Sequence, residues 1–267
     1  SIVVGTDYSS DTLDNFLAYK VKNTKKTPRF QSLTQPLGDQ FEEKNFVVRK
    51  MKYLLSPADM NGSGVIDNQS HLVAYQIKRD KGELKHQRQM DLKVTNGFGT
   101  LIVDTKKPDS LLMPSSINEF SPVAPLDPVN IDHFKCYSIR VQKKVCEDIP
   151  NLKCSNDDDC PTGTCNLGFP KDIQIQVEDQ FTEPKIFDVK NAKSLCLPLN
   201  NDNGEGGDGE THLMCYQIKR AKNEERHSKK NGIYINNQFS SGQLESGEYW
   251  QVNTVIEKQF CVPSQMN

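Results

Sequence analysis

The chain has 267 residues, of which 35% are hydrophobic and 25% charged, and its formal net charge is -2. Because basic and acidic residues are mixed along the chain, the sequence offers no basic field for nucleic acid, and we expect no nucleic-acid partner. No apolar run approaches the roughly 20 residues that a membrane-spanning helix needs, so we expect no transmembrane segment. The length allows two ordinary domains or one large β domain.

Residues 1–13 form a short β-prone tail whose apolar part is Ile2, Val3 and Val4. Such a segment either packs at the edge of its own sheet or adds as a strand to a neighbouring subunit, because an unpaired strand edge is a template for pairing. The start at Ser1 follows no basic and apolar leader. Removal of a signal peptide leaves such a start, and so does trimming of the chain.

One strand-like phrase occurs four times and divides the rest of the chain into repeats. Its copies span 15–22, 71–78, 133–140 and 212–219, and each contains one of the tyrosines Tyr19, Tyr75, Tyr137 and Tyr216. A second landmark follows, Asp-Gln-Phe, Asn-Gly-Phe or Asn-Gln-Phe, ending in Phe41, Phe98, Phe181 and Phe239. The tyrosine-to-phenylalanine distances are 22, 23, 44 and 23 residues, and the long one contains a cysteine-rich insert, residues 143–168. These aromatic residues are predicted to form the core of each repeat.

The repeats alternate in kind, which predicts that the duplicated unit is a pair of repeats. The first and third carry Asp-Gln-Phe, whereas the second and fourth carry Asn at that place. One repeat supplies only three or four short strands, too few to bury a core alone. We therefore predict an all-β protein with two tandem β-sandwich or barrel-like domains: residues 14–118 (repeats 14–60 and 70–117) and residues 131–267 (repeats 131–200 and 211–267), joined by a proline-rich linker, residues 119–130.

Residues 78–92 are highly charged and lack an apolar face, so they are predicted to be a solvated excursion. Three histidines, His71, His133 and His212, precede the recurrent strand. A catalytic residue rarely recurs in every module, so these histidines are predicted to cap or pack at strand starts. No nucleophile, phosphate-loop or metalloprotease motif occurs, and we expect no enzymatic activity. Trp250 is interpreted as a packed edge residue, with an exposed binding anchor as the alternative.

The eight cysteines all lie after residue 135, and four of them occupy repeat positions. Cys136 with Cys196, and Cys215 with Cys261, stand where the first two repeats have an alanine and a leucine: Ala18 with Leu55, and Ala74 with Leu112. Loss of both members together predicts two disulfides, each replaced elsewhere by apolar packing. A cross-link of this length stabilises by about 4 kcal/mol.

The other four cysteines, Cys146, Cys154, Cys160 and Cys165, lie in the insert. Two further disulfides are predicted, with three connectivities open. A four-thiolate zinc site is the rival, but the spacing lacks the paired knuckle typical of zinc, and we expect no cofactor. Disulfides in turn indicate an oxidising compartment, so we expect a secreted protein.

The connection between the first two repeats carries two weaker candidates. Asp59, Asn61 and Asp67 resemble the start of a calcium loop, but the twelfth position is Ser70, so the bidentate glutamate is missing and a surface turn is the alternative. Asn61 and Asn68 each begin an Asn-x-Ser glycosylation acceptor in a segment expected to be exposed.

The combined pattern, His-Leu-x-Cys-Tyr-x-Ile-Lys, then Asp/Asn-Gln-Phe, then Leu-Cys-x-Pro, resembles an uncharacterised tandem-repeat module of secreted bacterial and archaeal proteins. The resemblance covers residues 14–267 and implies export and a β architecture, with no catalytic residues. The first two repeats depart from it by lacking the cysteine pair.

From these observations we expect an exported, non-enzymatic structural protein of the cell surface. Its specific form would be a subunit of an extracellular filament or surface assembly, self-associating by β-strand addition through the tail. The alternative is an extracellular module that binds carbohydrate or another ligand.

Overall fold

The computed structural model describes residues 13–127, 129–149, 151–200, 210–240 and 246–267, and these form an all-β protein. The four repeats contribute the same three strands in the same order. The first strands are β1 (Asn15–Asn23), β4 (His71–Arg79), β7 (Phe134–Val141) and β12 (His212–Arg220). The short second strands are β2 (Leu33–Gly38), β5 (Leu92–Asn96), β10 (Ile173–Asp179) and β13 (Ile233–Asn237). The long third strands are β3 (Glu43–Met60), β6 (Gly99–Asn118), β11 (Thr182–Pro198) and β14 (Trp250–Met266).

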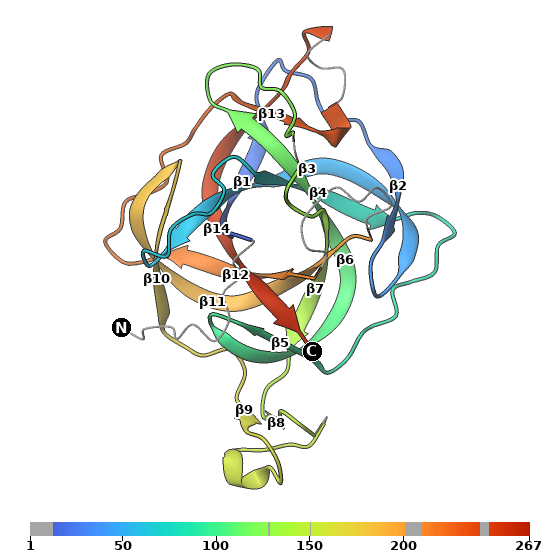
Figure 1. Cartoon of the computed structure of the whole chain (residues 1–267), viewed down its shortest axis with the longest axis vertical. Helices are drawn as coiled ribbons and strands as arrows, with labels where there is room; N and C mark the ends of the chain where they lie inside the picture. Colours follow the sequence, from blue (N-terminus) through green and yellow to red (C-terminus); the bar gives the residue numbers. More distant parts are fainter. Residues whose placement is uncertain (1–12, 128, 150, 201–209, 241–245) are drawn as a thin grey trace.

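The first and third strands of all four repeats pair into one closed antiparallel ring, which Figure 1 shows end-on. Within the described residues the order around the ring is β1, β3, β4, β6, β7, β11, β12 and β14, and β14 pairs back with β1. The short strands lie around the periphery of this ring. Closure leaves these eight strands with no unpaired edge along the shared part of the ring.

The two separate domains predicted from the sequence are therefore replaced by one unit. β6 of the second repeat pairs with β7 of the third along residues 103–112, across the predicted boundary. β1 pairs with β14, which joins the two ends of the chain. The proline-rich segment is not a spacer, because Asn236 Nδ2 donates to Val123 O (2.8 Å) and holds it against the fourth repeat.

A small apolar cluster drawn from all eight ring strands fills the interior of the ring. Successive side chains of a strand point to opposite faces, and residues in mutual contact from every strand of a closed ring must lie inside it. Each repeat supplies one large and two paired side chains. The members from the ring strands are Phe16, Ala18 and Leu55; Leu72, Ala74 and Leu112; Phe134, Cys136 and Cys196; and Leu213, Cys215 and Cys261.

The two disulfides predicted from the repeats are bonded in this interior. Cys136 is bonded to Cys196, and Cys215 to Cys261. The members of each pair face one another directly across neighbouring strands. The replacing pairs are also cross-strand neighbours, Ala18 with Leu55 and Ala74 with Leu112. The same interior position is thus filled by a covalent bond in half of the ring and by packing in the other half.

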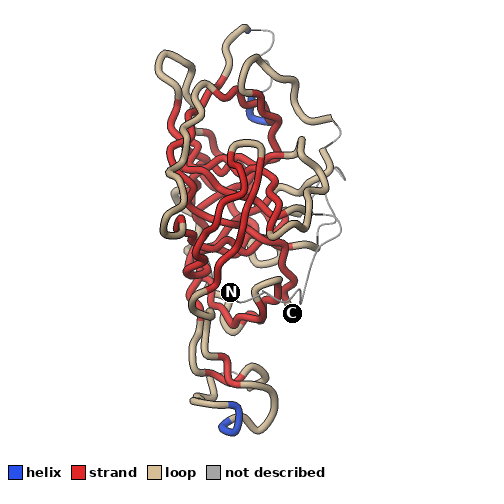
Figure 2. The backbone as a smooth tube through the Cα atoms, turned by 90° about the vertical axis from the view of Figure 1, so that its left-hand side faces the viewer, coloured by secondary structure: helices blue, strands red, loops and turns tan. Residues whose placement is uncertain are grey.

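The cysteine-rich insert projects outward from the side of the ring, as Figures 1 and 2 show. It holds β8 (Val145–Cys146), β9 (Cys165–Asn166) and the short 3-10 helix η1 (Asp157–Asp159); a second 3-10 helix, η2 (Gln238–Ser240), follows β13. Its disulfides join Cys146 to Cys160 and Cys154 to Cys165, one of the three open connectivities. The sulfurs are bonded to one another, so they do not form the rival zinc site.

No helix in the described part of the chain is long and apolar enough to cross a membrane. The four disulfides are compatible with an extracellular protein.

Candidate functional site

Each repeat tyrosine is fully buried on the outer face of the ring, where the turn of the repeat two places along covers it. At two of these places the turn brings an aspartate. The Tyr19 hydroxyl donates to Asp179 Oδ1 (2.9 Å), and the Tyr137 hydroxyl donates to Asp39 Oδ2 (2.8 Å). The first and third repeats therefore exchange their turns. We call these two places the Asp-type sites.

The second and fourth repeats exchange their turns in the same way, with asparagine in place of aspartate. Asn237 Nδ2 donates to the Tyr75 hydroxyl (3.0 Å) and to Ser115 Oγ (2.9 Å). In the same way Asn96 Nδ2 donates to the Tyr216 hydroxyl (2.8 Å) and to Ser264 Oγ (3.1 Å). We call these two places the Asn-type sites. The serine comes directly after the proline that ends the third landmark of every repeat. At the same place the first and third repeats have Ala58 and Leu199. An amide needs an acceptor for its second hydrogen and a carboxylate does not, so the serine accompanies the asparagine.

A second residue, with an aromatic ring, distinguishes the two kinds of site, and at three of the four sites it stands eleven positions after the tyrosine of the preceding repeat. At the fourth site the insert intervenes, and the residue is Phe169, 5.0 Å from Tyr216. At the Asn-type sites it is a phenylalanine: Phe30 lies 4.8 Å from Tyr75, ring centre to ring centre. At the Asp-type sites it is a histidine: His86 lies 4.8 Å from Tyr137, and His227 lies 5.0 Å from Tyr19. A basic ring thus accompanies the carboxylate, and an apolar ring accompanies the amide.

The sequence analysis assigned no role to His86 and His227, and it predicted residues 78–92, which contain His86, to be a solvated excursion. The segment is largely exposed, but the His86 side chain turns inward and is only 4% exposed. The signal was present in the internal alignment: Lys81-Gly82-Glu83-Leu84-Lys85-His86 matches residues 222–227 of the fourth repeat, which end in His227. A hydropathy pattern does not reveal a single inward-facing side chain in an otherwise charged segment.

Each Asp-type histidine links a carboxylate to a threonine. His86 Nδ1 lies 3.1 Å from Glu42 Oε2, and its Nε2 lies 2.7 Å from Thr105 Oγ1. Hydroxyl, imidazole and carboxylate in this order resemble a nucleophilic triad. Thr105, however, is 0% exposed, and its oxygen accepts a hydrogen bond from the Gln89 backbone N–H (2.8 Å). The hydrogen-bonded series of Thr105, His86 and Glu42 therefore serves to orient the Glu42 carboxylate.

Lys135 completes the site around Tyr137, and the sequence analysis did not single it out. Its side chain is 0% exposed, and its Nζ donates to Leu37 O (3.0 Å) and Glu42 O (2.9 Å) and lies 3.4 Å from Asp39 Oδ2. Burial lowers the pKa of Lys135, while the charges of Asp39 and Glu42 oppose that shift. All three ammonium hydrogens thus have acceptors, as a buried lysine requires.

At the other Asp-type site the pKa values of two carboxyl groups are shifted in opposite directions. Burial raises the pKa of Asp179 to about 6. Burial would also raise the pKa of Glu257, but hydrogen bonds from His227 and Lys185 outweigh it and lower this pKa to about 2. Lys185 Nζ lies 2.8 Å from Glu257 Oε1. Glu257 is therefore the ionised partner of Lys185, and Asp179 gains a proton first on acidification.

This difference makes the effect of D179N dependent on pH. The folded chain holds a proton on Asp179 below about pH 6, whereas the unfolded chain does so only near the ordinary value of 3.8. The free energy of unfolding that Asp179 contributes therefore rises as the pH falls from about 7 to about 4. We expect D179N to gain stability relative to the wild type at about pH 7.5 and to lose this advantage at about pH 4.5. Urea unfolding at both pH values measures the difference, and an equal difference at both would contradict it.

A basic groove with a volume of about 430 Å³ lies beside the Tyr137 site. It is formed by the start of β3, the end of β4 with the following loop, and the middle of β6. Among the described residues that line it are seven lysines and arginines: Lys44, Lys78, Arg79, Lys85, Arg88, Lys106 and Lys107. Glu42 is the one carboxylate in this lining, and Lys44 pairs with it at 2.6 Å. The groove therefore offers several unneutralised positive charges within one concave surface.

The surface near Tyr19 is the structural equivalent of the basic groove, so its residues show what the fold accepts at the positions of the groove lysines. Thr105 and Thr254 occupy equivalent places, since each bonds to a site histidine. Counting from them, Lys106 and Lys107 correspond to Val255 and Ile256. The fold thus accepts two apolar residues where the groove has two lysines, which marks these lysines as dispensable for folding.

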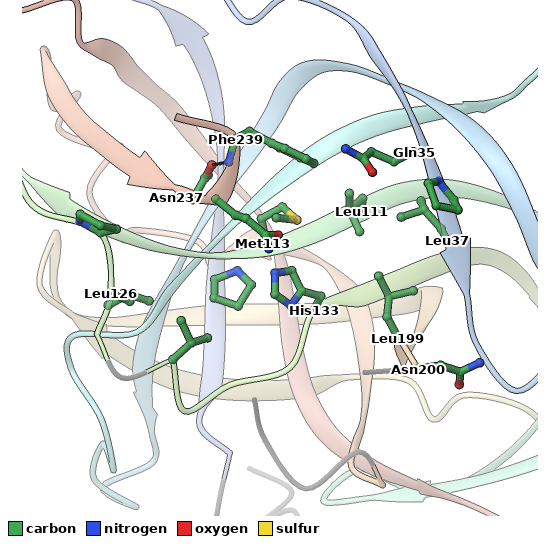
Figure 3. A pocket seen from close by; sticks show the side chains of 15 residues that line it. Gln35, Leu37, Leu111, Met113, Leu126, His133, Leu199, Asn200, Asn237 and Phe239 are labelled. Carbon is green, nitrogen blue, oxygen red and sulfur yellow. Dashed lines mark hydrogen bonds between the residues drawn. The ribbon is translucent and has the colours of Figure 1, made fainter. Parts of the chain in front are cut away.

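A larger cavity, of about 640 Å³, lies where β2, β6 and η2 meet the proline-rich segment (Figure 3). Leu111, Met113 and Leu126 contribute to its wall, and its polar members are Gln35, His133, Asn200, Asn237 and Gln238. Its described lining contains no lysine, arginine or carboxylate. It offers shape and apolar contact but no charge.

The histidines at strand starts lie where the sequence predicted, and each interacts with a glutamine of a turn: His71 with Gln180, His133 with Gln238 and His212 with Gln40. His71 Nδ1 donates to Gln69 O (3.0 Å), and burial lowers the pKa of His71 to about 4. His212 Nε2 lies 3.1 Å from Gln40 Nε2. Both histidines are buried, so they belong to the packing at these strand ends.

The calcium candidates accept separate hydrogen bonds from the chain itself. Asp59 Oδ1 accepts from Gly62 N (2.7 Å), Asn61 Oδ1 accepts from Gln176 N (2.9 Å), and Asp67 Oδ1 accepts from Gln69 N (2.8 Å). These bonds account for the three residues as turn-forming side chains.

The remaining predicted positions have different outcomes. The glycosylation candidates Asn61 and Asn68 are exposed. Trp250 is partly buried, and its ring lies 5.4 Å from that of Phe30, as expected of a packed edge residue. Ile2, Val3 and Val4, the strand proposed for donation, lie outside the described residues.

No protein-family model matches the chain, and comparisons with curated proteins and with solved structures find no significant match.

Proposed function

We propose that this chain is an exported, non-enzymatic module that binds an anionic ligand in the basic groove. The observation that carries the proposal is the convergence of seven cationic side chains on one concave surface of a chain whose net charge is -2. Such a concentration raises the local concentration of anions. The volume of the groove falls in the range of small-molecule sites.

The scaffold beneath the groove supports this role. β3, β4 and β6 are neighbours in the closed ring, so their relative positions are fixed by continuous strand pairing. Lys44 is held by Glu42, and Glu42 by His86. A site on rigid strands loses little conformational freedom when a ligand binds. The sequence offered Trp250 as a possible anchor for ligand binding. We propose the basic groove as the binding surface instead.

The double variant K106V/K107I tests the proposal by giving the groove the residues of its counterpart. Two exposed ion pairs contribute about 1–2 kcal/mol together, so we expect affinity for an anionic oligosaccharide to fall about tenfold. Calorimetry at low ionic strength measures the affinity, and added salt should weaken binding by the wild type more than by the variant. Unchanged affinity would contradict the proposal.

The matched variant V255K/I256K places the two lysines at the equivalent positions near Tyr19. Both variants keep residue types that the fold already carries at these places, so thermal unfolding should remain close to that of the wild type. We expect V255K/I256K to leave the affinity of the basic groove unchanged. A tenfold loss in this variant as well would show that the effect of K106V/K107I is not local.

A further inference from the structure

We infer that Lys135 and Asp39 react with one another to form an amide bond between their side chains. Their Nζ and Oδ2 atoms lie 3.4 Å apart, and both side chains are 0% exposed. The ion pair described above is then the reactant of a condensation that releases water and needs no other reagent. Neither residue belongs to the described lining of the basic groove, so this bond is independent of the proposed function.

The Lys135 amine is held so that one of its hydrogens faces Asp39. The other two are donated to the backbone oxygens of Leu37 (3.0 Å) and Glu42 (2.9 Å). Loss of the third hydrogen as a proton therefore leaves the lone pair of the amine facing the carboxyl group. Burial lowers the pKa of Lys135 against the opposing charges of Asp39 and Glu42, and this brings the neutral, nucleophilic amine within reach.

The Asp39 carboxyl group has hydrogen-bond donors on both of its oxygens. Oδ1 accepts from the backbone N–H groups of Phe41 (2.8 Å) and Glu42 (3.1 Å), which can stabilise the oxyanion of a tetrahedral intermediate. Oδ2 accepts from the Tyr137 hydroxyl (2.8 Å), which supports this oxygen as it leaves. The carboxyl carbon is one bond beyond Oδ2, so small torsional movements of the lysine side chain bring Nζ into contact with it.

The reaction moves two protons and exchanges one bond for another. Nζ first passes a proton to Oδ2, which converts the ion pair into a neutral amine and a neutral acid. The amine then attacks Cγ, and the C–N bond forms while negative charge develops on Oδ1. Nζ passes a second proton to Oδ2, the Cγ–Oδ2 bond breaks, and the oxygen leaves as water with both protons. The amide keeps one N–H, and the net charge of the pair is zero before and after.

The surroundings of the pair favour the amide over the two ions. The rings of Phe46 and Tyr137 have their centres 5.4 and 5.6 Å from Nζ, and charges held among buried rings are costly. The amide N–H retains a backbone acceptor, and Oδ1 retains its two N–H donors. The Tyr137 hydroxyl loses Oδ2, and the Glu42 side chain, with which it already interacts, replaces that acceptor. The product therefore keeps its polar groups hydrogen-bonded.

The other Asp-type site has a similar carboxyl arrangement without the amine. Asp179 Oδ1 accepts from the Tyr19 hydroxyl (2.9 Å) and from the backbone N–H of Phe181 (3.0 Å). Leu17 stands there in place of Lys135, so the fold forms this turn without a lysine. The amide joins the turn between β2 and β3 to β7, and that turn belongs to the part of the chain that has no cysteine.

The intact mass of the reduced and denatured wild-type chain tests the bond directly. We expect it to be lower than the mass of the sequence by one water molecule. Tryptic digestion should then yield the peptides that carry Asp39 and Lys135 as one branched species, while the peptide that carries Asp179 is unmodified. A chain at its full sequence mass, or a loss of water that maps to other residues, would overturn the inference.

The variants K135L and K44Q identify the amine. K135L takes the residue of the other Asp-type site and should have its full sequence mass. It should also migrate more slowly than the wild type on a reducing, denaturing gel, because it is not cross-linked. K44Q removes the neighbouring lysine that pairs with Glu42, and it should keep the loss of water. Loss of water in K135L, or full mass in K44Q, would contradict the role of Lys135, and the wild-type peptide map still decides the question if K135L fails to fold.

Discussion

Replacement of Asp39 by alanine is expected to lower the free energy of unfolding by about 3–5 kcal/mol, because it leaves a buried ammonium group without its counter-charge. Lys135 is 0% exposed and lies 3.4 Å from Asp39 Oδ2. The same substitution removes the acceptor of the Tyr137 hydroxyl, 2.8 Å away. Chemical denaturation with guanidinium, followed by circular dichroism, measures the loss.

A control for this prediction is provided by the Asn-type sites of the same fold. At the position of Lys135 the fourth repeat has Met214, and its tyrosine pairs with Asn96. We therefore expect the double variant D39N/K135M to be more stable than D39A, because no charge is left buried and unpaired. If D39N/K135M were the less stable of the two, the ion pair would not be the source of the loss.

The second large effect is expected from the disulfide inside the ring. The variant C136A/C196L takes the pair that the first two repeats use, and it should lose about 4 kcal/mol relative to the oxidised wild type. C136A/C196A also lacks the cross-link but leaves a cavity in place of the larger side chain. It should lose about 2–5 kcal/mol more, as other large-to-alanine substitutions do.

The comparison of the two variants separates the cross-link from the packing. Both lack the disulfide between β7 and β11, so their difference reports only how well the interior of the ring is filled. Urea unfolding under oxidising conditions measures both variants. Equal stability of the two would show that leucine does not enter the interior at position 196, against the equivalence with Leu55 and Leu112.

The closed ring explains how the first half of the molecule is held without disulfides. β1 is paired on one side with β3 and on the other with β14, whose Cys261 is bonded to Cys215. The strands that lack cysteines are therefore bounded on both sides by strands that have them. Packing of Ala18 against Leu55 is sufficient there because the ring constrains both strands.

The sequence by itself determined the repeat, the all-β class and the interior disulfides. These are properties of neighbouring strands, and the joint loss of Cys136 and Cys196 equivalents in two repeats shows directly which residues face one another. A pair of residues on adjacent strands leaves a trace at both positions, and internal repetition makes that trace visible in a single chain.

The tertiary structure alone decided how many repeats close one ring. The strand pattern of a repeat is the same whether the repeat pairs with one neighbour or with two, so the alternation of Asp and Asn in the sequence predicts two domains. The alternation instead records the exchange of turns across the ring, as between Tyr19 and Asp179. Contacts between residues 160 positions apart carry no signal in local hydropathy.

The basic groove could not be predicted from the sequence either, because its residues come from three separate segments, none of which is unusually basic by itself. Lys44, Lys85 and Lys106 each lie in a segment of mixed charge, and only the pairing of β3, β4 and β6 gathers them. Net charge sums over the whole surface, whereas a binding site depends on where the charges converge.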